Sequence, residues 1–403
     1  MSTIGIKYVS KDSFYRIRQH YYKPAVQNVF EQDHSFWIDK LKDDIRKGIR
    51  AKISGDGQFD SRGYCAMWCR YELLASPYNV VVGFAITHKR ECGGVSARAE
   101  VTGMKRALNQ LIEELGDERG CPIERFSTDR NSQVVVVMKN EYPAIKHERD
   151  AWHFIRNHTK AFMEKAKTVK YMSIRPHLRC LINHVWWATV VSEGDESLVK
   201  QRYMSAVRHV DGMHNWRKSK EFPTVTGCEH AKRKNTPGQL TPATKEWLTD
   251  LFKRNVDDVA LCSPCLMTSA VESFHAMASV FSPKDHYFTY EGHRLRTLIT
   301  ILRWNGIKRD LMEGRIKEEG KKKILNKTRK EYVDRKMYTP APHAYRFEII
   351  KAAYDVRRSM ESAPKKYSAP DTTPIPSSTL LEDSDDIQIA LEIQHFSGNN
   401  SIL

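Results

Sequence analysis

The heptapeptide Ala51-Lys52-Ile53-Ser54-Gly55-Asp56-Gly57 decides the fold class, because it has the pattern of a short strand, Ala51–Asp56, that ends at a turn. Two runs rich in aromatic and β-branched residues follow it, Cys65–Leu74 and Val80–Thr87. Ser76-Pro77-Tyr78-Asn79 between these runs is typical turn material. Together the three runs predict an antiparallel hairpin or meander that follows the first strand.

Beyond these strands the pattern alternates between helix and strand. Gly94–Leu115 has the apolar spacing of an amphipathic helix, and Ile123–Thr128 has the composition of a short strand. Val134–Met138 and Ile145–Glu148 continue the alternation up to Trp152, where a long helical region begins. This order of elements predicts an α/β fold with a mixed sheet.

The rest of the chain is predicted to be helical or irregular. Apolar residues at helical spacing occupy 6–48 and 152–254, and shorter helices are expected at 273–281 and 292–305. After Ser362 the chain is rich in Pro, Ser and Thr and then acidic, which predicts disorder. The expected parts are a helical segment 1–48, a mixed-sheet part 49–160, an all-helical part 161–260, a helical part 261–310 that carries Glu272, a basic charged helix or linker 311–360 and a disordered acidic tail 361–403.

Charge indicates the class of partner. The formal net charge is +16 at pH 7, and the chain from Ser368 onward contains six acids and no Lys or Arg, so the remainder is more basic still. Such a surplus favours a polyanion such as nucleic acid, because each neutralised phosphate releases condensed counterions. The alternative is that the basic charge only aids solubility.

Other features of the composition indicate an intracellular protein. No window approaches the roughly 18 consecutive apolar residues of a membrane span, and the N-terminus lacks the pattern of a secretory signal. The eight cysteines are scattered through a long chain, which favours reduced thiols over a disulfide framework. We therefore expect no membrane partner.

Three acids are notable for their positions. Asp56 and Asp129 each follow a predicted strand, and Glu272 begins a predicted helix. Two parallel strand ends and one helix can bring three carboxylates to one point, where hard oxygen ligands hold Mg²⁺ or Mn²⁺. A pair of such ions roughly 4 Å apart can activate a water or a 3′-hydroxyl at a phosphodiester. Taken singly, each acid could instead be a helix cap or a turn former. Asp60 competes with Asp56 for the first position, but only Asp56 directly follows the strand.

Five short motifs occur in order along the chain. They are Gly55-Asp56-Gly57-Gln58-Phe59-Asp60, Ser127-Thr128-Asp129-Arg130, Asp150-Ala151-Trp152-His153, Asn183-His184-Val185-Trp186-Trp187 and Ser269-Ala270-Val271-Glu272-Ser273-Phe274-His275. The series resembles the DDE transposases of eukaryotic cut-and-paste transposable elements. It is most similar to the Kolobok-like group, often fused to THAP zinc modules, within the broader assembly of Mutator-, hAT- and P-like transposases. The resemblance covers about residues 8–310.

The resemblance implies a ribonuclease-H-like mixed sheet with a large all-α insertion, placed here at 161–260. It also implies that Asp56, Asp129 and Glu272 are catalytic metal ligands of a two-metal Mg²⁺ or Mn²⁺ site. The separation of 143 positions between Asp129 and Glu272 agrees with an insertion, since it is too long for a plain crossover.

The pair Asp150 and His153 matches an element that this assembly of families shares. At i, i+3 spacing both side chains face one way if a helix has begun there. His153 would then lie beside the carboxylates, where it could contact a DNA phosphate or orient a ligand. Alternatively, Asp150 only caps the helix and His153 packs in the core.

A second constellation has the ligand types of structural zinc. It consists of His209, His214, Cys228 and His230, although the Cys-x-His spacing is tighter than usual. Buried or surface histidines are the alternative interpretation. The pair Cys262 and Cys265 has no second pair nearby and is expected to have a core role near Glu272.

Basic runs and tryptophans are the candidates for DNA contact. The runs are Lys232, Arg233 and Lys234 in the helical part and Lys321, Lys322 and Lys323 in the charged part, of which the second could equally be a nuclear-import signal or a solvated face. Trp186 and Trp187 could stack on a flipped base, but adjacent tryptophans on an apolar helix favour a core position.

The function that the resemblance implies is DNA transposition in the nucleus. The enzyme would cut and join phosphodiesters at transposon ends and target in double-stranded DNA, and it would act as a homo-oligomer. The main alternative is a domesticated or truncated transposase that binds DNA without catalysis, and a ribonuclease-H-type nuclease is a third. Fewer than 50 residues precede the first strand, and they contain no zinc-module pattern. Either the chain is a fragment or another component recognises the transposon ends.

Overall fold

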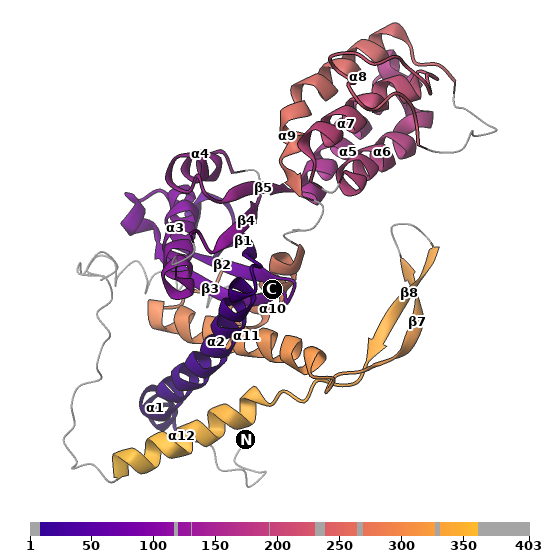
Figure 1. Cartoon of the computed structure of the whole chain (residues 1–403). Helices are drawn as coiled ribbons and strands as arrows, with labels where there is room; N and C mark the ends of the chain where they lie inside the picture. Colours follow the sequence, from indigo (N-terminus) through magenta and orange to yellow (C-terminus); the bar gives the residue numbers. More distant parts are fainter. Residues whose placement is uncertain are drawn as a thin grey trace, which may run out of the picture. The chain divides into compact units, whose positions relative to one another are not determined.

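The protein is an α/β structure with a mixed sheet, as predicted (Figure 1). The computed structural model describes residues 9–116, 120–129, 131–192, 194–229, 238–263, 269–326 and 331–361. Within this part of the chain the main sheet has six strands in the order β3-β2-β1-β4-β5-β6. The strands are β1 (Ala51–Phe59), β2 (Trp68–Ser76), β3 (Val80–His88), β4 (Ile123–Thr128), β5 (Lys146–Asp150) and β6 (Cys262–Ser263). Strands β2 and β3 are antiparallel, whereas β1, β4, β5 and β6 pair in parallel.

The helices form where apolar residues recur at helical spacing. The N-terminal ones are α1 (Lys11–Ile17) and α2 (Lys23–Arg46), joined by the π-helical turn Arg18–Tyr22, and they are followed by α3 (Ser96–Leu115) and α4 (Ser132–Glu141). The central ones are α5 (Ala151–Lys167), α6 (Leu178–Val191), α7 (Glu196–Val210), α8 (Pro242–Arg254) and α9 (Val256–Ala260). The last three are α10 (Ser269–Phe281), α11 (Tyr290–Met312) and α12 (Tyr345–Glu361). Among the described residues, no helix combines the length and the apolar character that crossing a membrane requires.

The chain divides into two compact units. Unit 1 comprises Met1–Arg50, Gly57–Pro122 and Val271–Leu403, and unit 2 comprises Ala51–Asp56 and Ile123–Ala270. The predicted tail 361–403 lies outside the described residues, apart from Glu361 at the end of α12.

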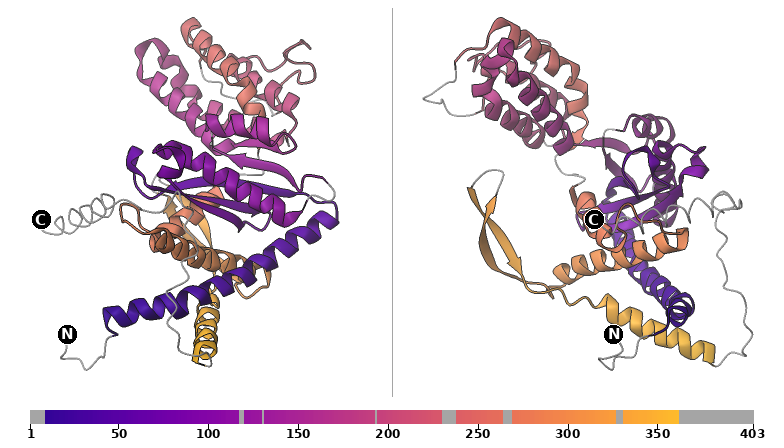
Figure 2. Two further views of the ribbon diagram at one scale, coloured as in Figure 1. Left: turned by 90° about the vertical axis from the view of Figure 1, so that its left-hand side faces the viewer. Right: turned by 180° about the vertical axis from the view of Figure 1, so that it is seen from behind.

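In unit 1, helices α3 and α11 pack closely against the antiparallel strands β2 and β3. Helix α3 packs against β2 and β3. A Cβ at Gly103 of α3 would lie only 3.1 Å from Tyr71 and 3.3 Å from Thr87, so this glycine permits the close approach. Helix α11 is anchored to β3, because the amide of Asn305 accepts from Val81 N at 2.9 Å and donates to Val81 O at 3.0 Å. Helices α2, α11 and α12 share a further apolar cluster (Figure 2).

The expectation of a charged helix or linker over 311–360 is wrong for the part that contains two strands, and the end of this range is helical. Strand β7 (Glu318–Asn326) and strand β8 (Glu331–Tyr338) form an antiparallel hairpin, and α12 follows them. Most described side chains of the hairpin are exposed. The hairpin therefore lacks the one-sided apolar alternation by which a half-buried strand is recognised in a sequence.

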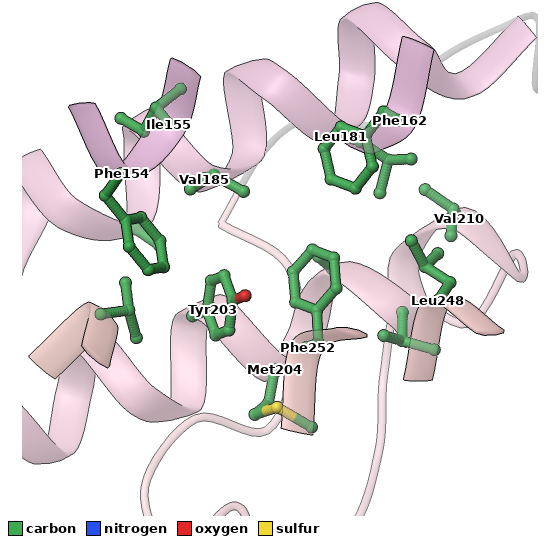
Figure 3. Close-up of a cluster of buried hydrophobic side chains, with 14 of the residues drawn as sticks. Phe154, Ile155, Phe162, Leu181, Val185, Tyr203, Met204, Val210, Leu248 and Phe252 are labelled. Carbon is green, nitrogen blue, oxygen red and sulfur yellow. The ribbon is translucent and has the colours of Figure 1, made fainter. Parts of the chain in front are cut away.

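Unit 2 contains the helices α5 to α9, which surround one apolar core (Figure 3). Phe162, Tyr203 and Phe252 are fully buried there, and the rings of Tyr203 and Phe252 stack with centroids 4.4 Å apart. Trp186 and Trp187 pack against this core as partly buried residues, as the core interpretation expects.

Candidate metal centre

Two aspartates of unit 2 occupy aligned positions on neighbouring parallel strands. Asp129 directly follows β4, whereas Asp56 lies within β1, which continues to Phe59 and does not end at Asp56 as predicted. Ser54 of β1 pairs with Ser127 of β4. Asp56 and Asp129 each follow two residues later, so the register extended from this pair aligns them. Neighbouring strands lie about 4.8 Å apart, and residues two positions on from a pair share its face of the sheet.

A third aspartate continues this row on the next strand. Thr128 of β4 pairs with Arg149 of β5, and Asp129 and Asp150 are the residues that follow them. Asp129 therefore lies in the middle of a row, with Asp56 on one side and Asp150 on the other. Three acids thus lie in a row across β1, β4 and β5, and two of them, Asp129 and Asp150, are at the carboxyl ends of their strands.

Asp129, Asp150 and His153 form a group that could hold a metal ion. Their ligand atoms all lie within 4.8 Å of one another. The Nδ1 atom of His153 is 3.0 Å from Asp129 Oδ1 and 3.5 Å from Asp150 Oδ2. Asp150 is buried, with 2% of its surface exposed, whereas the side chain of His153 is 24% exposed. Two carboxylates and an imidazole are a donor set that suits a divalent transition metal such as Mn²⁺.

Local structure explains how His153 reaches the carboxylates. Asp150 has an extended backbone and is the N-cap of α5, where its Oδ1 accepts a hydrogen bond from Trp152 N at 2.6 Å. Since the helix begins at the next residue, His153 lies about one turn on and faces Asp150. Both interpretations of this pair hold in part: Asp150 caps the helix, and His153 lies beside the carboxylates instead of in the core.

The carboxylates control the protonation of the histidine. Contact with Asp129, and secondly with Asp150, raises the pKa of His153 to about 10 against the opposing effect of burial. Burial lowers the pKa of the nearby His147 to about 4, and its Nε2 lies 2.9 Å from the hydroxyl of Thr128. At neutral pH the imidazolium of His153 therefore supplies positive charge to the acids, while His147 is neutral.

The other predicted acids lie in unit 1. Glu272 is exposed in the first turn of α10, one turn before His275. The His275 Nε2 atom is 2.8 Å from the fully buried carboxylate of Glu72, which fixes α10 against β2. Among the described residues, the group formed around Asp129 consists of Asp129, Asp150 and His153, all of unit 2.

Asp60 has a local structural role, which favours Asp56 for the first position. Its carboxylate accepts a hydrogen bond from Met67 N at 3.1 Å, and burial raises its pKa.

An exposed aromatic side chain adjoins the acidic group. Trp152 is 37% exposed, its ring centroid is 4.8 Å from that of His153, and the guanidinium of Arg156 lies 5.0 Å from the centroid of the indole ring. A flat aromatic surface backed by a cation is suited to contact with a nucleotide base. The sequence analysis missed Trp152, although it lies inside the quoted Asp150–His153 motif.

The remaining predicted residues fall into three groups. His209, His214 and Cys228 come together, with ligand atoms within 4.8 Å of one another. The residues His230, Lys232, Arg233, Lys234 and Cys265 lie outside the described residues. Lys321, Lys322 and Lys323 are exposed on β7, and Cys262 is buried in the core of unit 2.

Comparisons with known proteins add no assignment, since no protein-family model and no curated protein matches this sequence.

Proposed function

We propose that this chain is the catalytic core of a DNA transposase that hydrolyses phosphodiesters at transposon ends and joins the freed 3′-hydroxyl to target DNA. The row Asp56, Asp129 and Asp150 with His153 beside it carries this proposal. Carboxylates at the carboxyl edge of parallel strands suit metal-dependent chemistry on phosphates. Asp56, Asp129 and Glu272 remain the proposed catalytic set.

The central position of Asp129 supports its role as the principal ligand. It lies between Asp56 and Asp150 in the row and contacts His153 directly. A Mg²⁺ or Mn²⁺ ion held by such carboxylates supplies the charge that activates a water or 3′-hydroxyl and stabilises the leaving oxygen. Within the protein, Asp150 and His153 would keep the Asp129 carboxylate oriented toward the strand edge.

The sheet topology supports a ribonuclease-H-like assignment. Strands β1, β2 and β3 are consecutive in sequence and lie side by side in the sheet. The parallel strands β4 and β5 add on the other side of β1, which gives the order β3-β2-β1-β4-β5. The helices α5 to α9 lie in sequence between Asp129 and Glu272, where the resemblance expects an insertion.

Charge and surface chemistry support double-stranded DNA as the substrate and the nucleus as the location. The chain has a net charge of +16, and Trp152 with Arg156 offers a surface for a base beside the acidic group. A transposase of this kind would act on two DNA ends as a homo-oligomer.

The test is a plasmid excision assay with the matching element ends and Mg²⁺ or Mn²⁺. Wild-type protein is expected to excise the element, and Asp56→Ala, Asp129→Ala and Glu272→Ala are each expected to abolish excision. Asp257→Asn is the matched control, because that carboxylate is 86% exposed and pairs with Lys200. Excision that persists in all three variants would refute the assignment.

One observation favours a second candidate, a nuclear DNA-binding protein without catalysis. The imidazolium of His153 lies between Asp129 and Asp150, where it can compensate their negative charge in place of a metal ion. This alternative predicts duplex binding by wild type and no cleavage with either metal. DNA binding that is unchanged in Asp129→Ala would agree with both candidates, so cleavage decides between them.

A further inference from the structure

We propose that unit 2 binds a structural zinc ion through Cys180, His209, His214 and Cys228. This site is separate from the acidic group and does not depend on the proposed function. Cys180 did not figure in the sequence prediction, which placed His230 in the fourth position.

Three of the donors already lie at distances close to those of a metal site. His209 Nδ1 is 3.2 Å from Cys228 Sγ, and the rings of His209 and His214 are perpendicular with centroids 4.9 Å apart. Their ligand atoms lie within 4.8 Å of one another. Tetrahedral zinc has bonds of about 2.3 Å to sulfur and about 2.0 Å to nitrogen, which separates its ligand atoms by roughly 3.5 Å. Small side-chain movements would therefore complete the coordination.

A short antiparallel ribbon holds His214 and Cys228 opposite each other. Asn215 forms a bridge with Gly227, and Cys228 N donates to His214 O at 2.9 Å. A Cβ at Gly227 would lie 2.9 Å from both His214 O and Asn215 Oδ1, so the ribbon needs glycine at this position. The ribbon thus positions two of the ligands as a pair.

The antiparallel helices α6 and α7 supply the other two ligands. His184 Nε2 of α6 contacts Ser205 Oγ of α7 at 3.1 Å. One turn toward the start of α6 is Cys180, and one turn toward the end of α7 is His209. Because residues four apart share a helix face, this contact directs Cys180 toward the same side as His209, although the group of ligand atoms within 4.8 Å of one another does not include Cys180. His184 itself is engaged with Ser205 and with the carbonyl of Arg202 at 2.8 Å.

Electrostatics agree with the proximity of the two thiols. Burial raises the pKa of the Cys228 thiol, and the neighbouring Cys180 raises it further. Zinc reverses this effect, because a coordinating thiol is held as the thiolate. Two thiolates and two imidazoles select zinc over the Mg²⁺ or Mn²⁺ of an oxygen-ligand site.

The site would link three parts of unit 2. It connects the start of α6, the end of α7 and the ribbon 214–228. Gln201 of α7 already ties the ribbon to the helices, because its side-chain oxygen accepts from Thr224 N and Val225 N, each at 2.9 Å. A metal bond to each strand would add a second attachment at the other end of the ribbon. The function of this ion is structural, because four protein ligands leave no open position for a substrate.

The test is the zinc content of the full chain, purified without chelator under reducing conditions. Wild type is expected to retain one zinc ion per chain, and Cys180→Ser, Cys228→Ser and His214→Asn are expected to lose it. Cys65→Ser is the matched control, because Cys65 is an exposed cysteine of unit 1. A folded wild-type protein without zinc would overturn the proposal.

Cobalt substitution tests the Cys180 assignment at saturating Co²⁺, where a variant that loses zinc during purification can still be loaded with metal. The thiolate-to-cobalt charge-transfer band of wild type should have the intensity of two thiolates, and cobalt-loaded Cys180→Ser should have the intensity of one. An unchanged band in Cys180→Ser, or loss of zinc in His230→Asn, would overturn Cys180 as the fourth ligand. Asp129→Ala should keep its zinc, which separates a failure of this site from a failure of the proposed function.

Discussion

The carboxylates of Asp129 and Asp150 converge on one atom, His153 Nδ1, at distances of 3.0 and 3.5 Å. Asp150 is almost fully buried, and burying its negative charge is unfavourable. The contact with His153 and the hydrogen bond from Trp152 N of α5 offset this cost. The arrangement requires a positive charge between two acids, supplied by the imidazolium or by a metal ion.

Replacing His153 should destabilise the protein in the absence of divalent metal. In His153→Ala, Asp129 and Asp150 would repel each other, and we expect a loss of about 1 kcal/mol in the free energy of unfolding. Mn²⁺ should restore part of it, because the ion replaces the lost charge. Thermal unfolding with chelator and with Mn²⁺ measures both effects. His286→Ala, an exposed histidine of unit 1, is the control. A loss that Mn²⁺ leaves unchanged would contradict the prediction.

Two substitutions at Asp150 should separate the effect of its helix-capping hydrogen bond from the effect of its negative charge. Asp150→Asn keeps an oxygen that can accept from Trp152 N, whereas Asp150→Ala loses the cap and should cost about 1 kcal/mol more. Both should weaken Mn²⁺ binding, since neither has the carboxylate. Chemical denaturation and Mn²⁺ titration of the two variants provide the measurement. Equal stability of the two variants would show that the cap is unimportant.

The β7–β8 hairpin should contact DNA phosphates. Lys321 is paired across the strands with Lys336, and Lys322 with Arg335, so like charges face each other on an exposed ribbon. Such pairs are unfavourable unless an anion is bound between them. The double variant Lys322→Ala and Arg335→Ala should bind duplex DNA more weakly.

The salt dependence of DNA binding makes the prediction for the hairpin quantitative. The slope of log affinity against log salt should decrease by about 1 to 2, as expected for one or two lost phosphate contacts. Lys167→Ala is the control, because this exposed lysine belongs to α5 and pairs with Glu164. An unchanged slope in the hairpin variant would exclude the contact.

Unit 1 should lose stability in mild acid. Burial lowers the pKa of His88 to about 4 and that of His293 to about 3, against about 6.5 in an unfolded chain. Above pH ~6.5 the stability is fully present. The free energy of unfolding falls as the pH drops below about 6.5 toward the folded pKa values of about 4 and about 3. In this pH range only the unfolded chain takes up protons on these histidines.

His293→Phe should reduce this sensitivity. In the part of the chain that the structure describes, neither ring nitrogen of His293 has a hydrogen-bond partner, although both are buried. At pH 7 the free energy of unfolding of the variant should exceed that of wild type by about 1 kcal/mol. Between pH 7 and pH 5 the variant should lose about 1–2 kcal/mol less of this free energy than wild type does. Urea unfolding at the two values of pH compares it with wild type. An identical pH dependence in the variant would refute this account.

Gly227→Ala should disturb the ribbon of unit 2. The added methyl would meet His214 O at 2.9 Å, and we expect a cost on the order of 2 kcal/mol together with a lower zinc content. Gly238→Ala is the matched control, since no atom lies within 4 Å of its added Cβ. Thermal unfolding and metal analysis of both variants provide the comparison. A normal zinc content in Gly227→Ala would show that the ribbon tolerates the methyl.

The order of elements from Ala51 to the start of α5 was predictable because each has a local signature. The helix α3 has a one-sided apolar pattern, and the strands β2 and β3 are rich in buried apolar residues. The β7–β8 hairpin was missed because both of its faces are exposed and therefore polar. Its stability depends on pairing between strands, which composition does not reveal.

The candidate sites were predictable only as sets of residue types. Asp56 and Asp129 were recognised because each follows a strand, and His209, His214 and Cys228 because zinc ligands often recur at short spacing. Cys180 lies far from these in sequence and was missed. The antiparallel register of α6 and α7 could have identified it, since that register aligns Cys180 with His209.

The sequence by itself determined the strands and helices from Ala51 to the start of α5, and Asp56 and Asp129 as candidate ligands, because these depend on side-chain periodicity over a few residues. Only the tertiary structure decided which acids become neighbours. Strand register aligns Asp129 with Asp150 as well as with Asp56, and the start of α5 turns His153 toward both Asp129 and Asp150. The register of these parallel strands depends on pairing between segments that are distant in the chain, and no short turn joins the strands to set it locally.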